Sequence, residues 1–189
     1  MYIIGISGKL GSGKGTITKR LIELNSNFKE RFFAEKLKKF VCDLCGIDYE
    51  LSLTQEGKNT YIETFGMTLG ELLQDIGTKL RDTVDVDIWI KSIFTTMNNE
   101  GLYLISDLRF INECEYINKY NGVTLRVNRS NNTIGKKSKR DLNHKSETEL
   151  DNYIFDYVIE NNGTYDEFIS KIDGFYYNYY VPIFLKNIN

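Results

Sequence analysis

A glycine-rich stretch near the amino terminus has the residue types that bind a chain of phosphates. It reads Gly8-Lys9-Leu10-Gly11-Ser12-Gly13-Lys14-Gly15-Thr16. Glycines let the backbone curl so that successive N–H groups point inward, and the start of the following helix adds partial positive charge. Lys14 would reach the outer phosphates, and the hydroxyl of Thr16 would meet a magnesium ion. An apolar run, residues 2–6, precedes the stretch and an amphipathic run follows it. Strand, loop and helix in this order predict a nucleotide site.

Cations stand where phosphoryl transfer would need them. Such a transfer needs two substrates in line, magnesium, and positive charge against the charge that develops in the transition state. The candidate cations are Arg81 near a helix end, Arg109 after an apolar run, Arg126 and Arg129 around the next one, and the basic run Lys136, Lys137, Lys139 and Arg140. Asp107, at the end of the first apolar run, is a candidate carboxylate for organising magnesium. Each has a structural alternative: a helix-end charge for Arg81, an ion pair for Arg109, a helix cap for Asp107 and a solvated loop for the basic run.

The surrounding pattern predicts an α/β protein with one doubly wound, mostly parallel sheet. Strands are predicted at 2–6, 32–33, 102–107, 122–127 and 157–159, and helices at 17–24, 35–45, 69–81, 87–98, 112–120, 146–150 and 165–172. Residues 48–68 are polar and leave the prediction open. Ligands bind at the carboxyl ends of parallel strands, so Asp107 and Arg109 should lie beside the glycine-rich stretch. Trp89 is expected either in the core or as a platform for a base, and the tail aromatics are expected to pack or to form dimer contacts.

Composition argues against several other classes of protein. The net charge of -2 gives no pull toward nucleic acid or a membrane surface, and no apolar segment reaches spanning length. The sequence opens on an apolar strand without a leader pattern, so we expect a cytoplasmic address, in a host cell if the source is viral. Cys42 and Cys45 share an apolar helical face and are expected in the core. The alternatives are a redox pair or a zinc site with Cys114 and His144.

Several segments together resemble the deoxynucleoside monophosphate kinases of bacteriophages and related viruses. They are the glycine-rich stretch, Phe33-Ala34-Glu35-Lys36-Leu37-Lys38, the 71–78 segment with Arg81, Asp87-Ile88-Trp89, Ser106-Asp107-Leu108-Arg109-Phe110-Ile111-Asn112-Glu113, His144-Lys145-Ser146-Glu147 and the 155–161 segment. The usual phosphate loop has Ser or Thr directly after its lysine. Gly15 stands there instead, as in nucleoside monophosphate kinases, and phage members often have Asp. Ile111 replaces a frequent Pro, and the tail is unmatched.

The resemblance implies a P-loop kinase core that moves the γ-phosphoryl group of ATP, with Mg²⁺, onto a deoxynucleoside monophosphate. The chain would then be one domain, 1–189, with a helical acceptor-binding region at 46–100, a lid-like loop at 129–145 and an aromatic tail at 174–189. The implied roles are catalytic for Lys14, Asp107, Arg109 and Arg129; donor binding for Gly8, Leu10, Gly11, Ser12, Gly13, Lys14, Gly15 and Thr16; acceptor binding for Arg81, Trp89, Arg109, Arg126, His144 and Glu147; and magnesium binding for Thr16 and Asp107.

Other nucleotide-binding classes fit less well. The base-reading and switch motifs of GTPases and the catalytic loop of protein kinases are missing from the sequence. A small-molecule kinase similar to the animal-type phosphomevalonate kinases, which share the S-D-x-R and V-I-E-N elements, stays open as an alternative. So does a regulator that binds nucleotide without turnover. We expect nucleotides as small-molecule partners, and a homodimer is also compatible with the sequence.

Overall fold

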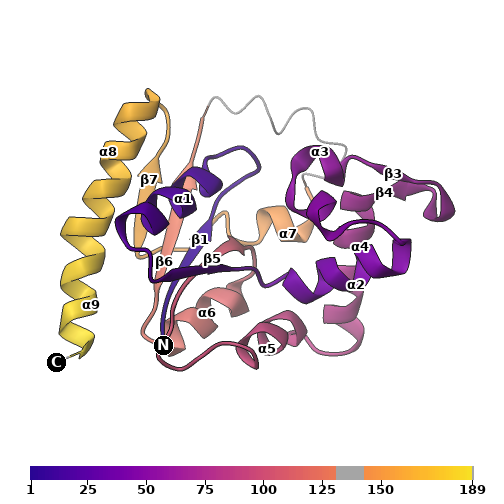
Figure 1. The fold of residues 1–189 in the computed structure, drawn as a ribbon, viewed down its shortest axis with the longest axis horizontal. Helices are drawn as coiled ribbons and strands as arrows, with labels where there is room; N and C mark the ends of the chain where they lie inside the picture. Colours follow the sequence, from indigo (N-terminus) through magenta and orange to yellow (C-terminus); the bar gives the residue numbers. More distant parts are fainter. Residues whose placement is uncertain (131–142, 189) are drawn as a thin grey trace.

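A parallel five-stranded sheet forms the centre of the computed structural model, which describes residues 1–130 and 143–188 (Figure 1). The strands are β1 (Tyr2–Ser7), β2 (Phe28–Arg31), β5 (Leu102–Leu108), β6 (Val123–Asn128) and β7 (Tyr157–Glu160). Their order is β2-β5-β1-β6-β7, and every neighbouring pair is parallel. The predicted α/β architecture is therefore confirmed. The carboxyl ends of β1, β5 and β6 lie at one edge of the sheet, where a ligand site is expected.

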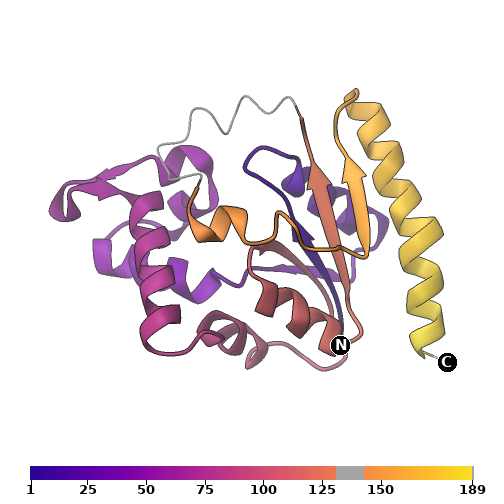
Figure 2. The same cartoon turned by 180° about the vertical axis from the view of Figure 1, so that it is seen from behind.

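Helices cover both faces of this sheet (Figures 1 and 2). They are α1 (Lys14–Leu24), α2 (Glu35–Cys45), α3 (Gln55–Lys58), α4 (Leu69–Thr83), α5 (Ile88–Phe94), α6 (Ile111–Lys119), α7 (Lys145–Thr148), α8 (Tyr165–Phe175) and α9 (Val181–Ile188). Alternation along β1 separates two cores, because successive side chains of a strand point to opposite faces. Ile4 and Ile6 pack with α1 and α8, whereas Ile3 packs with α2, α4, α5 and α6.

The second strand lies earlier in the chain than predicted. We expected it at Phe32-Phe33, but β2 occupies Phe28–Arg31 and pairs only with β5 at the edge of the sheet. An edge strand is covered less completely than a central one, so Lys29 and Glu30 are exposed and β2 has no apolar run. Phe33 follows the strand and enters the core, where its side chain is 2% exposed. The apolar pair Phe32-Phe33 is therefore not a strand, and its Phe33 packs in the core just after β2.

The helix predicted over 87–98 is shorter in the structure, since α5 ends at Phe94. Tight turns follow, in which the N–H of Thr96 bonds to the C=O of Ile93 and the N–H of Met97 to the C=O of Phe94. Met97 still reaches the core, as predicted. The open segment 48–68 forms the 3₁₀ turns η1 (Tyr49–Leu53) and η2 (Glu63–Phe65), α3, and the hairpin strands β3 (Tyr61–Ile62) and β4 (Met67–Thr68).

The aromatic tail is one long helix that runs along the side of the sheet (Figure 2). α8 continues through a π-helical turn, η4 (Tyr176–Tyr180), into α9. The rings of Tyr180 and Phe184 each lie 5.4 Å from the ring of Tyr2 on β1. These tail aromatics pack in the core, one of the two roles expected for them. Within the described ranges, none of the helices has the length and apolar character needed to cross a membrane.

Candidate active site

The glycine-rich loop joins β1 to α1, as the sequence predicted. Gly8, Gly11 and Gly13 have φ values of 157°, 76° and 114°, a region that residues with a side chain rarely adopt. Asn161, just after β7, donates a hydrogen bond of 2.8 Å from its side-chain amide to the C=O of Ser12. Ser12 is itself 1% exposed. The loop is thus curled by its glycines and anchored to the sheet, which leaves its N–H groups organised for an anion.

Lys14 lies over this loop from the first position of α1. Its ammonium group donates to the carbonyl oxygens of Gly8, at 2.5 Å, and Lys9, at 3.1 Å. Thr16 follows on the same first turn of the helix, at the positive end of the helix dipole. The arrangement places a cation, a hydroxyl group and a helix amino terminus together, which suits a nucleoside triphosphate.

Two glycines of the loop should respond in opposite ways to substitution by alanine. A methyl group on Gly13 would lie 2.8 Å from the amide nitrogen of Asn161 and 2.9 Å from the ring of Phe168, at a positive φ. Gly15 is helical, and a methyl group there would meet nothing within 4 Å. We expect Gly13→Ala to lower the free energy of unfolding by roughly 1–3 kcal/mol, and Gly15→Ala to raise it by up to ~1 kcal/mol. Urea denaturation measures both. Equal losses in the two variants would contradict this view of the loop.

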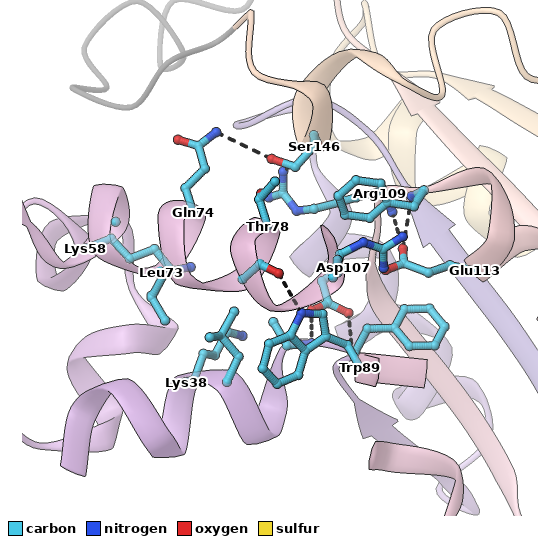
Figure 3. A pocket seen from close by; sticks show the side chains of 17 residues that line it. Lys38, Lys58, Leu73, Gln74, Thr78, Trp89, Asp107, Arg109, Glu113 and Ser146 are labelled. Carbon is cyan, nitrogen blue, oxygen red and sulfur yellow. Dashed lines mark hydrogen bonds and ion pairs between the residues drawn. The ribbon is translucent and has the colours of Figure 1, made fainter. Parts of the chain in front are cut away.

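The main pocket lies between α2, α4, α5 and the carboxyl end of β5 (Figure 3). One part of its wall is apolar, with Leu37, Leu73 and Trp89, and the other carries Asp107 and Arg109. Arg81 also lines it, but its side chain is buried: the guanidinium stacks 3.7 Å above the ring of Phe110. Such a pocket can take a molecule with an apolar ring system at one end and an anion at the other.

Arg109 lines this pocket and a smaller one next to the glycine-rich loop. The smaller pocket is also lined by Ser7, Gly8 and Lys9. The guanidinium of Arg109 donates to the C=O of Ser146 at 3.1 Å and forms an ion pair with Glu147. The ion-pair alternative for Arg109 is therefore present in the structure, together with a position between the two cavities.

Asp107 is occupied by the backbone that follows β2. Its two carboxylate oxygens accept hydrogen bonds from the N–H groups of Phe33, at 2.7 Å, and Ala34, at 3.0 Å. These bonds satisfy two backbone donors just before α2. Asp107 is not itself an N-cap residue, because the N-caps of α2 and α6 are Ala34 and Phe110. Asp107 also lines the main pocket, and a carboxylate has about four lone-pair sites.

The other candidate residues lie around the same edge of the sheet. Trp89 is 8% exposed and donates from its ring nitrogen to the C=O of Gly77, so it is part of the core as well as the pocket wall. Arg126 bonds to the hydroxyl of Ser7 at 3.0 Å, and Arg129 to the C=O of Gly11 at 3.4 Å. His144 lies 3.4 Å from the hydroxyl of Thr78. Most of the predicted lid, with the basic run at 136–140, falls outside the described residues.

A family model described as deoxynucleotide monophosphate kinase matches residues 52–172, which is more than half of the chain. A protein of Acanthamoeba polyphaga mimivirus, also named as a deoxynucleotide monophosphate kinase, is 35% identical over 91% of this chain and 94% of its own length. The chain belongs to the deoxynucleotide monophosphate kinase family.

Solved structures show more distant similarity to this deoxynucleotide monophosphate kinase. TT1252 from Thermus thermophilus has a TM-score of 0.49 at 16% identity and covers 94% of this chain and 97% of its own. A dephospho-CoA kinase from Campylobacter jejuni has a TM-score of 0.46 at 15% identity, with coverage of 90% and 93%. Family membership is the finding that bears on the acceptor, and it favours a nucleotide over the phosphomevalonate-like alternative.

Sequence reasoning assigned no role to six polar side chains that line the kinase pocket: Lys38, Lys58, Gln74, Thr78, Glu113 and Ser146 (Figure 3). Lys38 is 7% exposed, its ammonium group lies 4.0 Å from the centre of the Phe32 ring, and burial lowers its pKa. A lysine among the apolar positions Leu37, Val41 and Cys42 was the available signal. The side-chain amide of Gln74 donates to the hydroxyl of Ser146 at 3.4 Å, a pairing across 72 positions that no local pattern announces.

The buried carboxyl group of Glu113 is expected to make the kinase's stability depend on pH. Burial raises its pKa to about 8, against the opposing effect of the Arg109 N–H and of Arg81. An exposed glutamate titrates near ~4.3, so between these values the folded state binds a proton that the unfolded chain has released. The free energy of unfolding should therefore fall as pH rises from about 5 to about 8, by up to ~1.4 kcal/mol per pH unit from this group. Urea titrations of the parent and Glu113→Gln across this range measure it. A constant difference between the two proteins would contradict the prediction.

Proposed function

We propose that this enzyme transfers the γ-phosphoryl group of ATP to a deoxynucleoside monophosphate and releases ADP and the deoxynucleoside diphosphate. ATP would bind on the glycine-rich loop, and the acceptor in the main pocket, with its phosphate toward Arg81 and Arg109 and its base toward Leu73 and Trp89. The observation that carries the proposal is the place of Arg109 in the walls of both pockets. A group there can contact the donor and the acceptor at once.

The chemistry asked of the side chains is mainly electrostatic. An acceptor phosphate oxygen attacks the γ-phosphorus while the bond to the bridging β,γ-oxygen breaks, and no covalent bond to the enzyme forms. Lys14 and the loop N–H groups would bind the β- and γ-phosphates. Arg109, with Arg129 from the β6 end, would offset the charge that develops on the transferred group. Arg126, His144 and Glu147 would line the acceptor side and keep Arg109 in place.

Magnesium is the expected metal, because phosphates and water complete its octahedron and the protein need supply only one or two oxygens. The residues present fit this requirement. Among residues 1–130 and 143–188, no cluster of three or more His, Cys, Asp or Glu side chains could bind a metal by itself. Thr16 on the first turn of α1 and the pocket-facing side of Asp107 are the oxygens that we propose for it. When bound, Mg²⁺ would neutralise phosphate charge.

The test is release of ADP from ATP and Mg²⁺ against a panel of deoxy- and ribonucleoside monophosphates and phosphomevalonate. We expect turnover with one or more deoxynucleotides, slower turnover with their ribo counterparts, and none with phosphomevalonate or after chelation of the metal. Turnover with phosphomevalonate alone would refute the acceptor class. ATP binding by calorimetry with no transfer to any acceptor would favour the non-catalytic regulator. The Lys14→Ala protein, purified in parallel, controls for contaminating kinases.

We also propose that the protein acts in the cytoplasm, on nucleotides and not on nucleic acid. The net charge of -2 supports the second point, since a nucleic-acid site needs a basic surface. A homodimer is the assembly that we propose to look for. Light scattering on the purified chain, with and without oligonucleotide, tests the homodimer and the exclusion of nucleic acid. A mass shift with oligonucleotide would contradict that exclusion.

A further inference from the structure

Glu113 is a buried carboxyl group in the pocket wall without an assigned role. It lies on the first turn of α6, its side chain is 3% exposed, and it lines the main pocket between the two arginines. Buried carboxyl groups are costly, and a fold retains one only where its oxygens are engaged. Here the two oxygens face two different partners.

The first oxygen fixes the backbone from which Arg109 projects. Oε2 of Glu113 accepts hydrogen bonds from the N–H of Arg109, at 2.8 Å, and the N–H of Phe110, at 3.0 Å. Both residues directly follow β5, where the chain leaves the sheet and turns into α6. The direction in which the Arg109 side chain starts is therefore set by Glu113.

The second oxygen faces Arg81, which comes from α4 on the other side of the pocket. Oε1 of Glu113 lies 3.6 Å from Nη1 of Arg81, and the side chain of Arg81 is 6% exposed. The other terminal nitrogen, Nη2, donates to the side chain of Asn112 at 2.8 Å. Nη1 itself has no hydrogen-bond partner among the described residues. A buried guanidinium with a spare donor in a pocket wall suits an anionic ligand.

We propose that Glu113 is the positioning residue that aligns Arg81 and Arg109 on one acceptor phosphate. The proposal rests on the proposed function, because it assumes that the two guanidinium groups bind the acceptor. The carboxyl group of Glu113 contacts both the side chain of Arg81 and the backbone N–H of Arg109, so it fixes the two residues relative to each other. Glu113 itself does not touch the substrate. A purely structural alternative exists, since the same bonds cap the amino terminus of α6.

Two variants and a matched control distinguish the positioning role of Glu113 from a purely structural, helix-capping role. Glu113→Ala removes both contacts, whereas Glu113→Gln retains an oxygen for the two N–H groups and loses the one that faces Arg81. Asp156→Ala is the control, because Asp156 accepts from the N–H of Thr124, at 2.8 Å, and from its hydroxyl, at 2.7 Å, near the start of β6 and away from the pocket. Like Glu113, Asp156 accepts from a backbone N–H group, although its side chain is exposed and it accepts from one such group where Glu113 accepts from two.

Kinetics and NMR provide the readouts. In Glu113→Ala we expect KM for the deoxynucleotide to rise ~10-fold or more and KM for ATP to change less than ~3-fold, with a smaller acceptor effect in Glu113→Gln. The ¹⁵N side-chain signals of Arg81 and Arg109, assigned through their Lys variants, should both shift in Glu113→Ala and only that of Arg81 in Glu113→Gln. Asp156→Ala should shift neither signal.

Three results would overturn the positioning role. The first is an equal rise of both KM values in Glu113→Ala, and the second is a melting loss like that of Asp156→Ala with no change in acceptor KM. The third is arginine signals that do not move in the Gln variant, which decides the matter if the Ala variant does not fold. A parent enzyme that turns over no deoxynucleotide would refute the proposed function alone, since the NMR comparison does not depend on turnover.

Discussion

Lys14→Ala is expected to fold like the parent and to transfer phosphate at least ~100-fold more slowly. The ammonium group now bonds to the carbonyl oxygens of Gly8 and Lys9, within the curl of the loop, and would reach the β- and γ-phosphates of bound ATP from there. Its positive charge is already in place when charge develops on the transferred group, and water cannot replace it without reorganisation. Steady-state kcat with the best acceptor, together with circular dichroism, measures the loss.

Lys79→Ala is the matched control for Lys14. Lys79 lies on α4, its side chain is 70% exposed, and it pairs with Asp75 one turn earlier. An exposed pair of this kind contributes little to stability or activity, so kcat should stay within about a factor of two of the parent. If Lys14→Ala also keeps that rate, the loop does not act on a transferred phosphate, and the donor site must be sought elsewhere.

Arg109→Ala should lower kcat by up to ~10³-fold and weaken ATP binding much less. Arg109 lines both pockets, so its guanidinium would contact the phosphoryl group during transfer. The loop and Lys14 would still bind the donor. Calorimetry with a non-hydrolysable ATP analogue gives the donor affinity, and kcat with a saturating deoxynucleotide gives the rate. Comparing the two separates transition-state stabilisation from donor binding.

Arg20→Ala provides the comparison for a lost arginine. Arg20 forms a two-bond ion pair with Asp173, at 2.7 and 2.8 Å, that links α1 to α8. Its removal takes away a guanidinium of similar exposure and should cost stability without changing either kinetic constant beyond about twofold. Equal losses of rate and of ATP affinity in Arg109→Ala would place Arg109 on the donor alone.

The sequence was most informative where function imposes spacing. The loop glycines, Lys14 and Thr16 follow a spacing that is typical of phosphate-binding loops, so their local order was enough to predict a loop between β1 and α1. Asp107 and Arg109 could be placed because ligands gather at the carboxyl ends of parallel strands. The central strands β1, β5 and β6 were recognisable as apolar runs for the same reason that they are buried on both faces.

The pocket side chains that were missed depend on long-range contacts. Lys38 and Glu113 are charged residues buried by elements far away in the chain, and the pairs that Gln74 and Arg109 make with Ser146 and Glu147 join positions that are 72 and 38 residues apart. Local periodicity carries no record of such pairs. The edge strand β2 was misplaced because its exposed side needs no apolar residues. Local order thus identified the loop, whereas tertiary contacts decide which polar side chains line the main pocket.

One asymmetry of the main pocket has a consequence for evolution. The end that we propose for the phosphate is lined by Arg109, which directly follows β5, and by Arg81 in the last turn of α4, whereas Leu73 and Gln74 lie near the amino end of α4. If the acceptor lies as proposed, mutations near the amino end of α4 can alter which base is accepted and leave the reacting groups where they are. A lineage whose genome adopts a modified base could thus retune its nucleotide supply through a few changes on one helix.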